Sequence, residues 1–319
     1  MIHRFTIESK YDELQLSVLE MEPESPRCRA VVQLVHGMTE YKERYLPFMQ
    51  YLAKNGYRCV IHDHRGHGES VKSADDLGYM YDGGWRALVD DVRMVNNWIR
   101  RQYPGTKIVL FGHSMGSLAV RSFVRRYDSR VDALIVCGSP SYNPAVLAGM
   151  ALAKVEGWIM GSHHRSRLLT SIAFGAMNKQ YADEGLKNAW LCCNRKVVEA
   201  YNADPKCNYL FTDNGYFNLF GLMRDCYNTD GWVMRNSALP VFFISGGDDG
   251  CRTNDRAFAR AVDAMRRVGY RKVSSHLFPR MRHEILNETN KAEVWQYVID
   301  TIEKSLRWDY HGDYPDTEE

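Results

Sequence analysis

The sequence of 319 residues predicts an α/β protein built on a mostly parallel, doubly wound sheet, with a helical cap inserted into it. Short apolar, β-prone runs alternate with segments of helical spacing, which is typical of a parallel sheet with helices on both faces. From about residue 141 to 237 this alternation stops, and a stretch rich in Met, Trp, Tyr and Phe shows helical spacing alone. We therefore assign residues 1–140 and 238–319 to a core domain and residues 141–237 to the cap.

The sheet is expected to open with an antiparallel hairpin, because apolar and polar residues alternate over residues 5–7 and 14–18. Residues 31–35 are instead almost continuously apolar, as in a strand that helices cover on both faces. Further buried strands are predicted at residues 57–61, 107–111, 131–136, 239–244 and 272–278. Helices are predicted near residues 45–53, 85–99, 115–127, 258–265 and 295–302, where apolar residues recur with helical spacing.

The cap begins with an apolar stretch over residues 145–153. It predicts either a lid above an apolar, acyl-accepting pocket or an ordinary buried helix of the cap. Periodicity does not separate these two interpretations. A helix that lies on a membrane surface is a third interpretation, which the scarcity of basic residues in the stretch disfavours.

Composition excludes several classes of protein. Lys and Arg number 41 against 39 Asp and Glu, and a net charge of +2 does not favour nucleic-acid binding through phosphate contacts. The N-terminus lacks the apolar core of a signal peptide, and no run approaches the ~20 apolar residues of a membrane span. Eight cysteines lack the spacing of a disulfide framework or a zinc site. We expect a cytoplasmic protein with free thiols, no transmembrane segment, no nucleic-acid partner and no cofactor or metal.

The segment Gly112-His113-Ser114-Met115-Gly116 lies between a β-prone run and a helical segment. This strand-turn-helix context is the one that a nucleophile elbow requires, so Ser114 is the candidate nucleophile. The glycines have a steric reason, because side chains at 112 and 116 would collide where the strand and the helix cross.

An acid and a histidine follow the elbow at the ends of later strands. The elbow, the turn at Asp248-Asp249 and His283 are all expected at the carboxyl edge of the sheet, where such loops converge. A serine hydroxyl needs an imidazole to accept its proton, and the imidazole needs a carboxylate to fix its tautomer. Both Asp248 and Asp249 are candidates for that carboxylate.

Several motifs together resemble those of the α/β-hydrolase serine esterases, nearest the monoacylglycerol lipase and lysophospholipase group. They are His36-Gly37-x-x-Glu40 with Arg44-Tyr45, Asp63-x-Arg65-Gly66-His67-Gly68-x-Ser70, the elbow, Gly246-x-x-Asp249 and Arg282-His283. The order serine, acid, histidine along the chain is also that of the α/β-hydrolase fold.

The resemblance implies a role for each matching residue. Ser114 would be the nucleophile, Asp249 the acid and His283 the general base, with the backbone N–H groups of Met38 and Met115 as the oxyanion hole. It implies a carboxylic ester as substrate, a small molecule and lipid-like if the cap is a lid. An acyltransferase, a peptidase and a non-catalytic binding protein on the same scaffold are the alternatives.

Other polar residues of these motifs have simpler interpretations. The sequence His62-x-His64-x-Gly66-His67 is similar to a zinc signature, but Gly66 stands in the place of its aspartate, and a tight turn with Arg65 bonded to nearby carbonyls or to Asp63 is favoured. His113 is expected to pack beside the elbow. Glu40, Glu284 and Glu288 are expected either to support the site residues or to lie in solvent on the surface.

Overall fold

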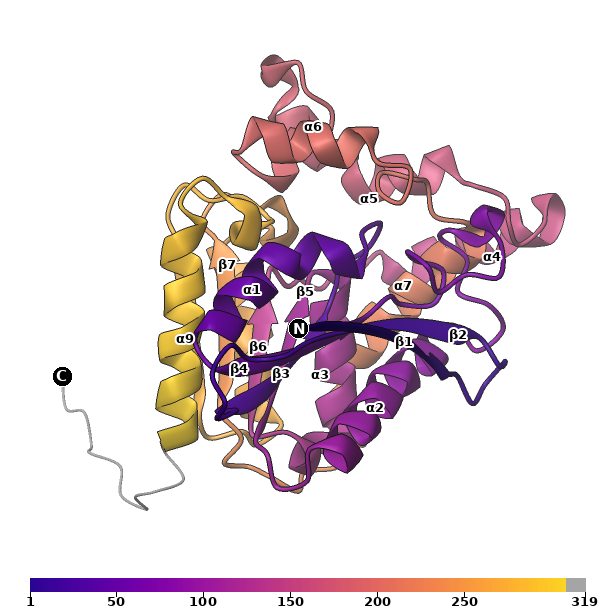
Figure 1. The fold of residues 1–319 in the computed structure, drawn as a ribbon. Helices are drawn as coiled ribbons and strands as arrows, with labels where there is room; N and C mark the ends of the chain where they lie inside the picture. The colour runs from indigo at the N-terminus through magenta and orange to yellow at the C-terminus, as the bar shows by residue number, and fades with distance from the viewer. Residues whose placement is uncertain (308–319) are drawn as a thin grey trace.

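The computed structural model describes residues 1–307, and those residues form a sheet of eight strands (Figure 1). Residues 308–319, the end of the predicted segment 238–319, lie outside the described part of the chain. The strands are β1 (Ile2–Glu8), β2 (Gln15–Met21), β3 (Ala30–Val35), β4 (Tyr57–His62), β5 (Ile108–His113), β6 (Ala133–Cys137), β7 (Val241–Gly246) and β8 (Val273–Phe278).

The strand order is β1-β2-β4-β3-β5-β6-β7-β8. β1 and β2 form the predicted antiparallel hairpin, and β2 also pairs antiparallel with β4. From β4 to β8 every pair of neighbours is parallel. The predicted fold class, a mostly parallel doubly wound sheet, is confirmed.

Helices cover both faces of this sheet, as continuous apolar strands require. They are α1 (Leu46–Lys54), α2 (Gly84–Gln102), α3 (Met115–Tyr127), α4 (Val146–Met160), α5 (Arg167–Gln180), α6 (Arg195–Ala203), α7 (Asp213–Tyr227), α8 (Asp255–Arg267) and α9 (Lys291–Arg307). Side chains of β3 alternate between two cores: Val32 and Leu34 pack with α1 and α9, whereas Val31 and Val35 pack with α2, α3 and α8. Each fully buried Val or Leu contributes about 1.5–3 kcal/mol to this packing.

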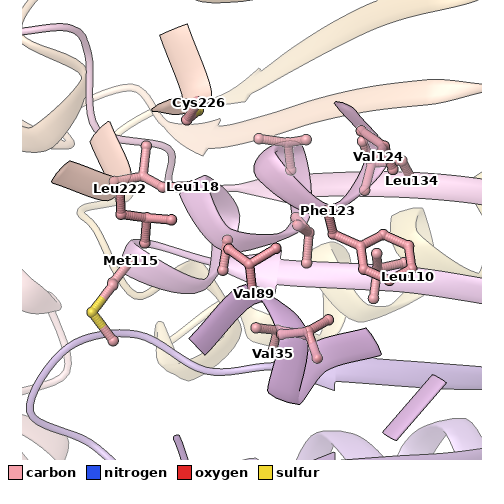
Figure 2. Close-up of a cluster of buried hydrophobic side chains, with 14 of the residues drawn as sticks. Val35, Val89, Leu110, Met115, Leu118, Phe123, Val124, Leu134, Leu222 and Cys226 are labelled. Carbon is pink, nitrogen blue, oxygen red and sulfur yellow. The ribbon is translucent and has the colours of Figure 1, made fainter. Parts of the chain in front are cut away.

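The cap segment lies between β6 and β7, and its last helix packs into the main core. Figure 2 shows Met115 and Leu118 of α3 grouped with Leu222 of α7, and Cys226 belongs to the same cluster. By contrast, α5 and α6 stand above the edge of the sheet (Figure 1). Segment 141–237 therefore contains one helix that completes the core and others that rise away from it.

The apolar stretch 145–153 forms most of α4, but this helix is not buried. Only Val146 and Ala153 of α4 are buried, while Trp158 is 86% exposed and Ile159 is 65% exposed. The interpretation as an ordinary buried helix is therefore wrong. Across residues 1–307, no helix combines the length and the apolar composition needed to cross a bilayer.

Candidate active site

Ser114 occupies the tight turn between β5 and α3. Its φ of 53° and ψ of −120° place a non-glycine residue in a strained region of conformational space, at a cost on the order of 1–3 kcal/mol. Two hydrogen bonds hold the turn: the Ser114 N–H donates to the carbonyl oxygen of Cys137 (3.0 Å), and the Ser117 hydroxyl donates to the Ser114 carbonyl oxygen (2.5 Å). This is the geometry expected of a nucleophile elbow.

The two glycines of the elbow are required by contact distances. A Cβ on Gly112 would lie 2.5 Å from the carbonyl oxygen of Gly116. A Cβ on Gly116 would lie 2.1 Å from the carbonyl oxygen of Val35. Gly112 thus permits the predicted close crossing of β5 and α3, whereas Gly116 permits α3 to pass the end of β3.

His283 and Asp249 meet at the carboxyl edge of the sheet, after β8 and β7. The Nδ1 atom of His283 lies 3.0 Å from both carboxylate oxygens of Asp249. That carboxylate also accepts hydrogen bonds from the Ser245 hydroxyl (2.9 Å) and the Cys251 N–H (2.8 Å). Asp248 is exposed. Of the two candidate acids, the structure brings Asp249 to the histidine.

The Asp249 carboxyl stays ionised although it is buried. Burial acts to raise its pKa, but His283, the Cys251 N–H and the Ser245 hydroxyl together hold the pKa below its usual value. An ionised acid at this position fixes the proton of His283 on Nδ1 and leaves Nε2 as a proton acceptor.

The Nε2 side of His283 faces a cavity of about 560 Å³ that Ser114 also lines. Near it, the Sγ atom of Cys251 lies 3.9 Å from Nε2, and the ring of Trp190 lies 5.2 Å from the imidazole ring. Trp190 comes from the cap, so the cap encloses this part of the site.

Met38 and Met115, the predicted sources of oxyanion-hole N–H groups, line the same cavity. Met115 is the first residue of α3, where backbone N–H groups have no partner within the helix. Met38 lies in a loop that Glu40 holds, because the Glu40 Oε1 atom accepts hydrogen bonds from the Gly37 N–H (2.5 Å) and the Tyr45 hydroxyl (2.9 Å).

Glu40 and Glu284 are buried, each at most 4% exposed, so their interpretation as solvated surface groups is wrong. Arg44 joins them, with N–O distances of 2.9 Å to Glu40 and 2.7 Å to Glu284. The Nδ1 atom of His113 lies 3.2 Å from Glu40, and its Nε2 atom lies 3.3 Å from the carbonyl oxygen of His283. Burial opposes the charged imidazole, but Glu40 and Glu284 raise the pKa of His113.

Glu288 is also buried, at 2% exposed, and it joins the histidine loop to the cap. Its carboxylate accepts hydrogen bonds from the N–H groups of Arg282 (2.8 Å) and Cys193 (3.1 Å). In addition, the Glu284 N–H donates to the carbonyl oxygen of Leu191 (2.7 Å). Sequence patterns carry no signal for the two cap contacts, because Cys193 and Leu191 lie more than 90 residues from Glu288 and Glu284.

The histidine-rich loop after β4 is buried beneath the site. The His64 N–H donates to His36 Nε2 (2.9 Å), and burial lowers the pKa of His67 to about 4. Gly66 and Gly68 have φ of 72° and 53°, as a tight turn requires.

Arg65 of this loop does not bond to Asp63 as expected. Its guanidinium binds Asp91 and Asp12, each at 2.8 Å, whereas Asp63 binds the Lys42 ammonium at 2.7 Å. The reason is that Lys42 pairs with Asp63, while Asp12 and Asp91 approach Arg65 from distant elements that the motif does not contain.

The cavity has two kinds of lining. From α3, α4 and α7 it is lined by Leu118, Val146, Leu219, Phe220 and Met223. From α5 and the loops of the cap it is lined by Asn178, Lys187, Asn188 and Asn208, and the Asn188 amide nitrogen lies 2.9 Å from the Asn208 amide oxygen. An amphiphilic molecule matches such a lining, with apolar surface for one part and amide groups for another.

Several known proteins resemble the chain along most of its length. The monoacylglycerol lipase of Mycolicibacterium smegmatis is 26% identical over 283 residues, which cover 87% of this chain and 89% of that protein. The monoglyceride lipase of Mus musculus is 25% identical over 273 residues, 82% of this chain and 81% of that protein.

Solved structures and a family model agree with these relatives. A thermostable carboxyl esterase from Bacillus coagulans superposes with a TM-score of 0.86 at 20% identity, over 96% of this chain and 99% of its own. The monoacylglycerol lipase of Paleococcus ferrophilus gives 0.69 at 20% identity, over 91% and 99%. The family model described as "Serine aminopeptidase, S33" matches residues 26–290. The elbow, the sheet and this match lead to one conclusion: the chain belongs to this family of α/β-hydrolases.

Proposed function

We propose that the protein is a serine hydrolase that cleaves carboxylic esters through an acyl-enzyme, with a monoacylglycerol or lysophospholipid type of substrate. The observation that carries the proposal is a single cavity lined by Ser114 at a strained elbow, by His283 bound to a buried Asp249, and by apolar side chains. Relatives named monoacylglycerol lipase support the same substrate class.

The reaction has two steps. Ser114 attacks the ester carbonyl while His283 Nε2 takes its proton, and the N–H groups of Met38 and Met115 stabilise the oxyanion of the tetrahedral intermediate. His283 then gives the proton to the leaving alcohol, and the acyl group remains on Ser114. Water attacks the acyl-enzyme in the second step, with His283 again as the base, and the carboxylic acid leaves.

The cavity lining favours an ester over a peptide with a free amino group. An aminopeptidase needs a carboxylate that binds the substrate ammonium. Glu40 and Glu284 are the acids among the described residues that line the cavity, and Arg44 and His113 already engage them. Neither is free to bind an ammonium group, whereas Leu219 and Phe220 offer apolar surface to an acyl chain.

Labelling with a fluorophosphonate probe tests the nucleophile. The wild-type protein is expected to react, and Ser114→Ala is expected to abolish the label. Ser171→Ala, which changes an exposed serine of α5, is the matched control and should label as the wild type does. Equal labelling of wild type and Ser114→Ala would refute the proposal.

Turnover of p-nitrophenyl esters from acetate to dodecanoate tests the substrate class. Each added CH₂ that enters the cavity contributes up to about 0.8 kcal/mol, or about fourfold in kcat/KM. We expect kcat/KM to rise from acetate to octanoate, and a preference for acetate would exclude a lipid-like substrate. A competing alcohol in the same assay separates hydrolysis from acyl transfer by the product formed.

A further inference from the structure

A second cluster of chemistry-bearing side chains lies in the cap, on elements other than those that carry Ser114, Asp249 and His283. Glu156 of α4, His164 of the following loop and Asp213 at the start of α7 bring one ligand atom each within 4.8 Å of one another. We propose that these three residues bind a divalent cation of the zinc type and so clamp α4 to α7.

The backbone places the three residues together. The loop after α4 turns back onto the start of α7, where the Asp213 N–H donates to the His164 carbonyl oxygen (2.8 Å) and the Asn214 N–H donates to the Ser162 carbonyl oxygen (3.4 Å). On the other side, α4 approaches so closely that a Cβ on Gly157 would lie 3.4 Å from the Cβ of Asp213. Two helices and a loop thus converge on one point.

Two carboxylate oxygens where these elements converge lack a hydrogen-bond partner within residues 1–307. Asp213 is 1% exposed, and its Oδ2 atom lies 3.0 Å from His164 Nδ1. Its Oδ1 atom and the Oε2 atom of Glu156 are both buried, and neither has a hydrogen-bond partner among the described residues. An ionised carboxylate can only accept, so a buried carboxylate oxygen without a donor is costly unless a cation serves as its partner.

The donor set selects the kind of cation. One imidazole nitrogen with two carboxylates suits Zn²⁺, whereas Ca²⁺ and Mg²⁺ prefer oxygen ligands alone. Three protein ligands leave a fourth position of a tetrahedral site for water. Zinc–ligand distances are about 2.0–2.2 Å, so binding requires the three ligand atoms, which lie within 4.8 Å of one another, to converge on the ion.

A clamp at this point acts on the walls of the cavity. α4 contributes Val146 to the cavity lining, and α7 contributes Leu219 and Phe220. A bound cation would fix one end of α4 against α7 and stabilise the folded cap, because it binds the folded arrangement and not the unfolded chain.

The test must separate this cluster from a second group of potential ligands, formed by Asp249, Cys251 and His283. Calorimetric titration with Zn²⁺ is therefore carried out on the full chain and on Cys251→Ala, after treatment with EDTA and its removal. We expect one Zn²⁺ to bind in both proteins, and Glu156→Gln and Asp213→Asn each to weaken this binding at least tenfold. His163→Gln removes the neighbouring imidazole, which pairs with Asp76, and should bind as the wild type does.

Thermal unfolding with and without Zn²⁺ gives an independent readout. At a free concentration of about 100 times the Kd, Zn²⁺ is expected to raise Tm by roughly 5 °C, and Mg²⁺ is expected to have no such effect. The rise should persist in Cys251→Ala and vanish in Glu156→Gln, whose Tm in EDTA shows whether it is folded. Binding that disappears in Cys251→Ala, or that survives unchanged in both Glu156→Gln and Asp213→Asn, would overturn the proposal.

Discussion

Two carboxylate–histidine pairs lie side by side under the cavity, and only one of them is arranged for proton transfer. Asp249 with His283 and Glu40 with His113 are all buried, and the two imidazole rings are 4.8 Å apart. His283 presents Nε2 to the cavity, with Cys251 Sγ beside it at 3.9 Å. The Nε2 atom of His113 instead lies 3.3 Å from the His283 carbonyl oxygen.

The two pairs differ in what the Nε2 atom of each histidine contacts. A general base needs an imidazole nitrogen that faces the substrate as well as a carboxylate beside the other nitrogen. Because both nitrogens of His113 are engaged, we expect this histidine to support the backbone of His283 and to take no part in the reaction. We therefore expect the first pair to govern rate and the second to govern stability.

The largest effect is expected from Asp249→Asn. An amide at this position favours the wrong tautomer of His283, and kcat is expected to fall by about 10⁴-fold, with Tm little changed. Asp248→Asn is the matched control and should keep nearly the full rate. A larger loss of rate in Asp248→Asn than in Asp249→Asn would mean that the wrong acid has been assigned.

The largest loss of stability is expected when Arg44, which pairs with Glu40 of the second pair, is replaced. Arg44→Met leaves Glu40 and Glu284 buried without their shared partner, and a loss of about 3–5 kcal/mol in the free energy of unfolding is expected. Urea unfolding measures this change. If Arg44→Met were as stable as the wild type while its kcat fell steeply, the assignment of a structural role to the second pair would be wrong.

A pH dependence should distinguish the second pair further. The pKa of His113 is raised, so its contribution to stability is complete below the unfolded value of about 6.5 and is lost as the pH rises through the folded value. Above pH 6.5 this contribution of His113 should fall by at most about 1.4 kcal/mol per pH unit. The buried histidines at 36, 62, 64 and 67 have lowered pKa values, so the stability that each contributes increases as the pH rises through about 6.5 and opposes the change from His113 in the wild type.

Denaturant titrations of the wild type and of His113→Gln above pH 6.5 isolate the contribution of His113 as the difference between their free energies of unfolding, which should shrink as the pH rises. His3→Gln, a change on the edge strand β1, should follow the wild type. A difference that does not change with pH would place the titrating group elsewhere.

The smallest effect is expected for the partly exposed ion pair at the rim of the site, between Glu184 and Arg282. Glu184 and Arg282 form an ion pair next to His283, but the Glu184 side chain is 36% exposed, and such pairs contribute about 0–1 kcal/mol. Glu184→Gln should lower the free energy of unfolding by at most about 1 kcal/mol. Its kcat should stay within about twofold of the wild-type value. A larger loss of kcat would show that this rim pair, and not Glu288 beneath it, holds the histidine loop.

The sequence was sufficient for those parts of the molecule that local patterns determine. Continuous apolar runs predicted the parallel strands, alternation predicted the β1–β2 hairpin, and Gly112 predicted the close crossing of β5 and α3. Asp249 and His283 could be paired because loops after parallel strands meet at one edge.

Contacts between distant segments were beyond such patterns. Nothing near Glu40 in the sequence indicates that Arg44 also reaches Glu284, 240 residues away, or that Arg65 binds Asp12 and Asp91. The exposure of α4 was equally hidden, since its apolar composition is the one expected of a buried helix.

The position of α7 determines where this molecule could be recombined with its relatives. Leu222 and Cys226 of α7 belong to the same apolar cluster as residues of α3. A chimera that exchanged all of residues 141–237 would therefore replace part of the buried core as well as the cap. A second junction near Thr212, ahead of α7, would keep Leu222 and Cys226, and only Ala153, Leu169 and Phe211 of the buried cluster would be exchanged. We expect a cap exchange designed in this way to alter the choice of substrate while α7 keeps its packing on α3.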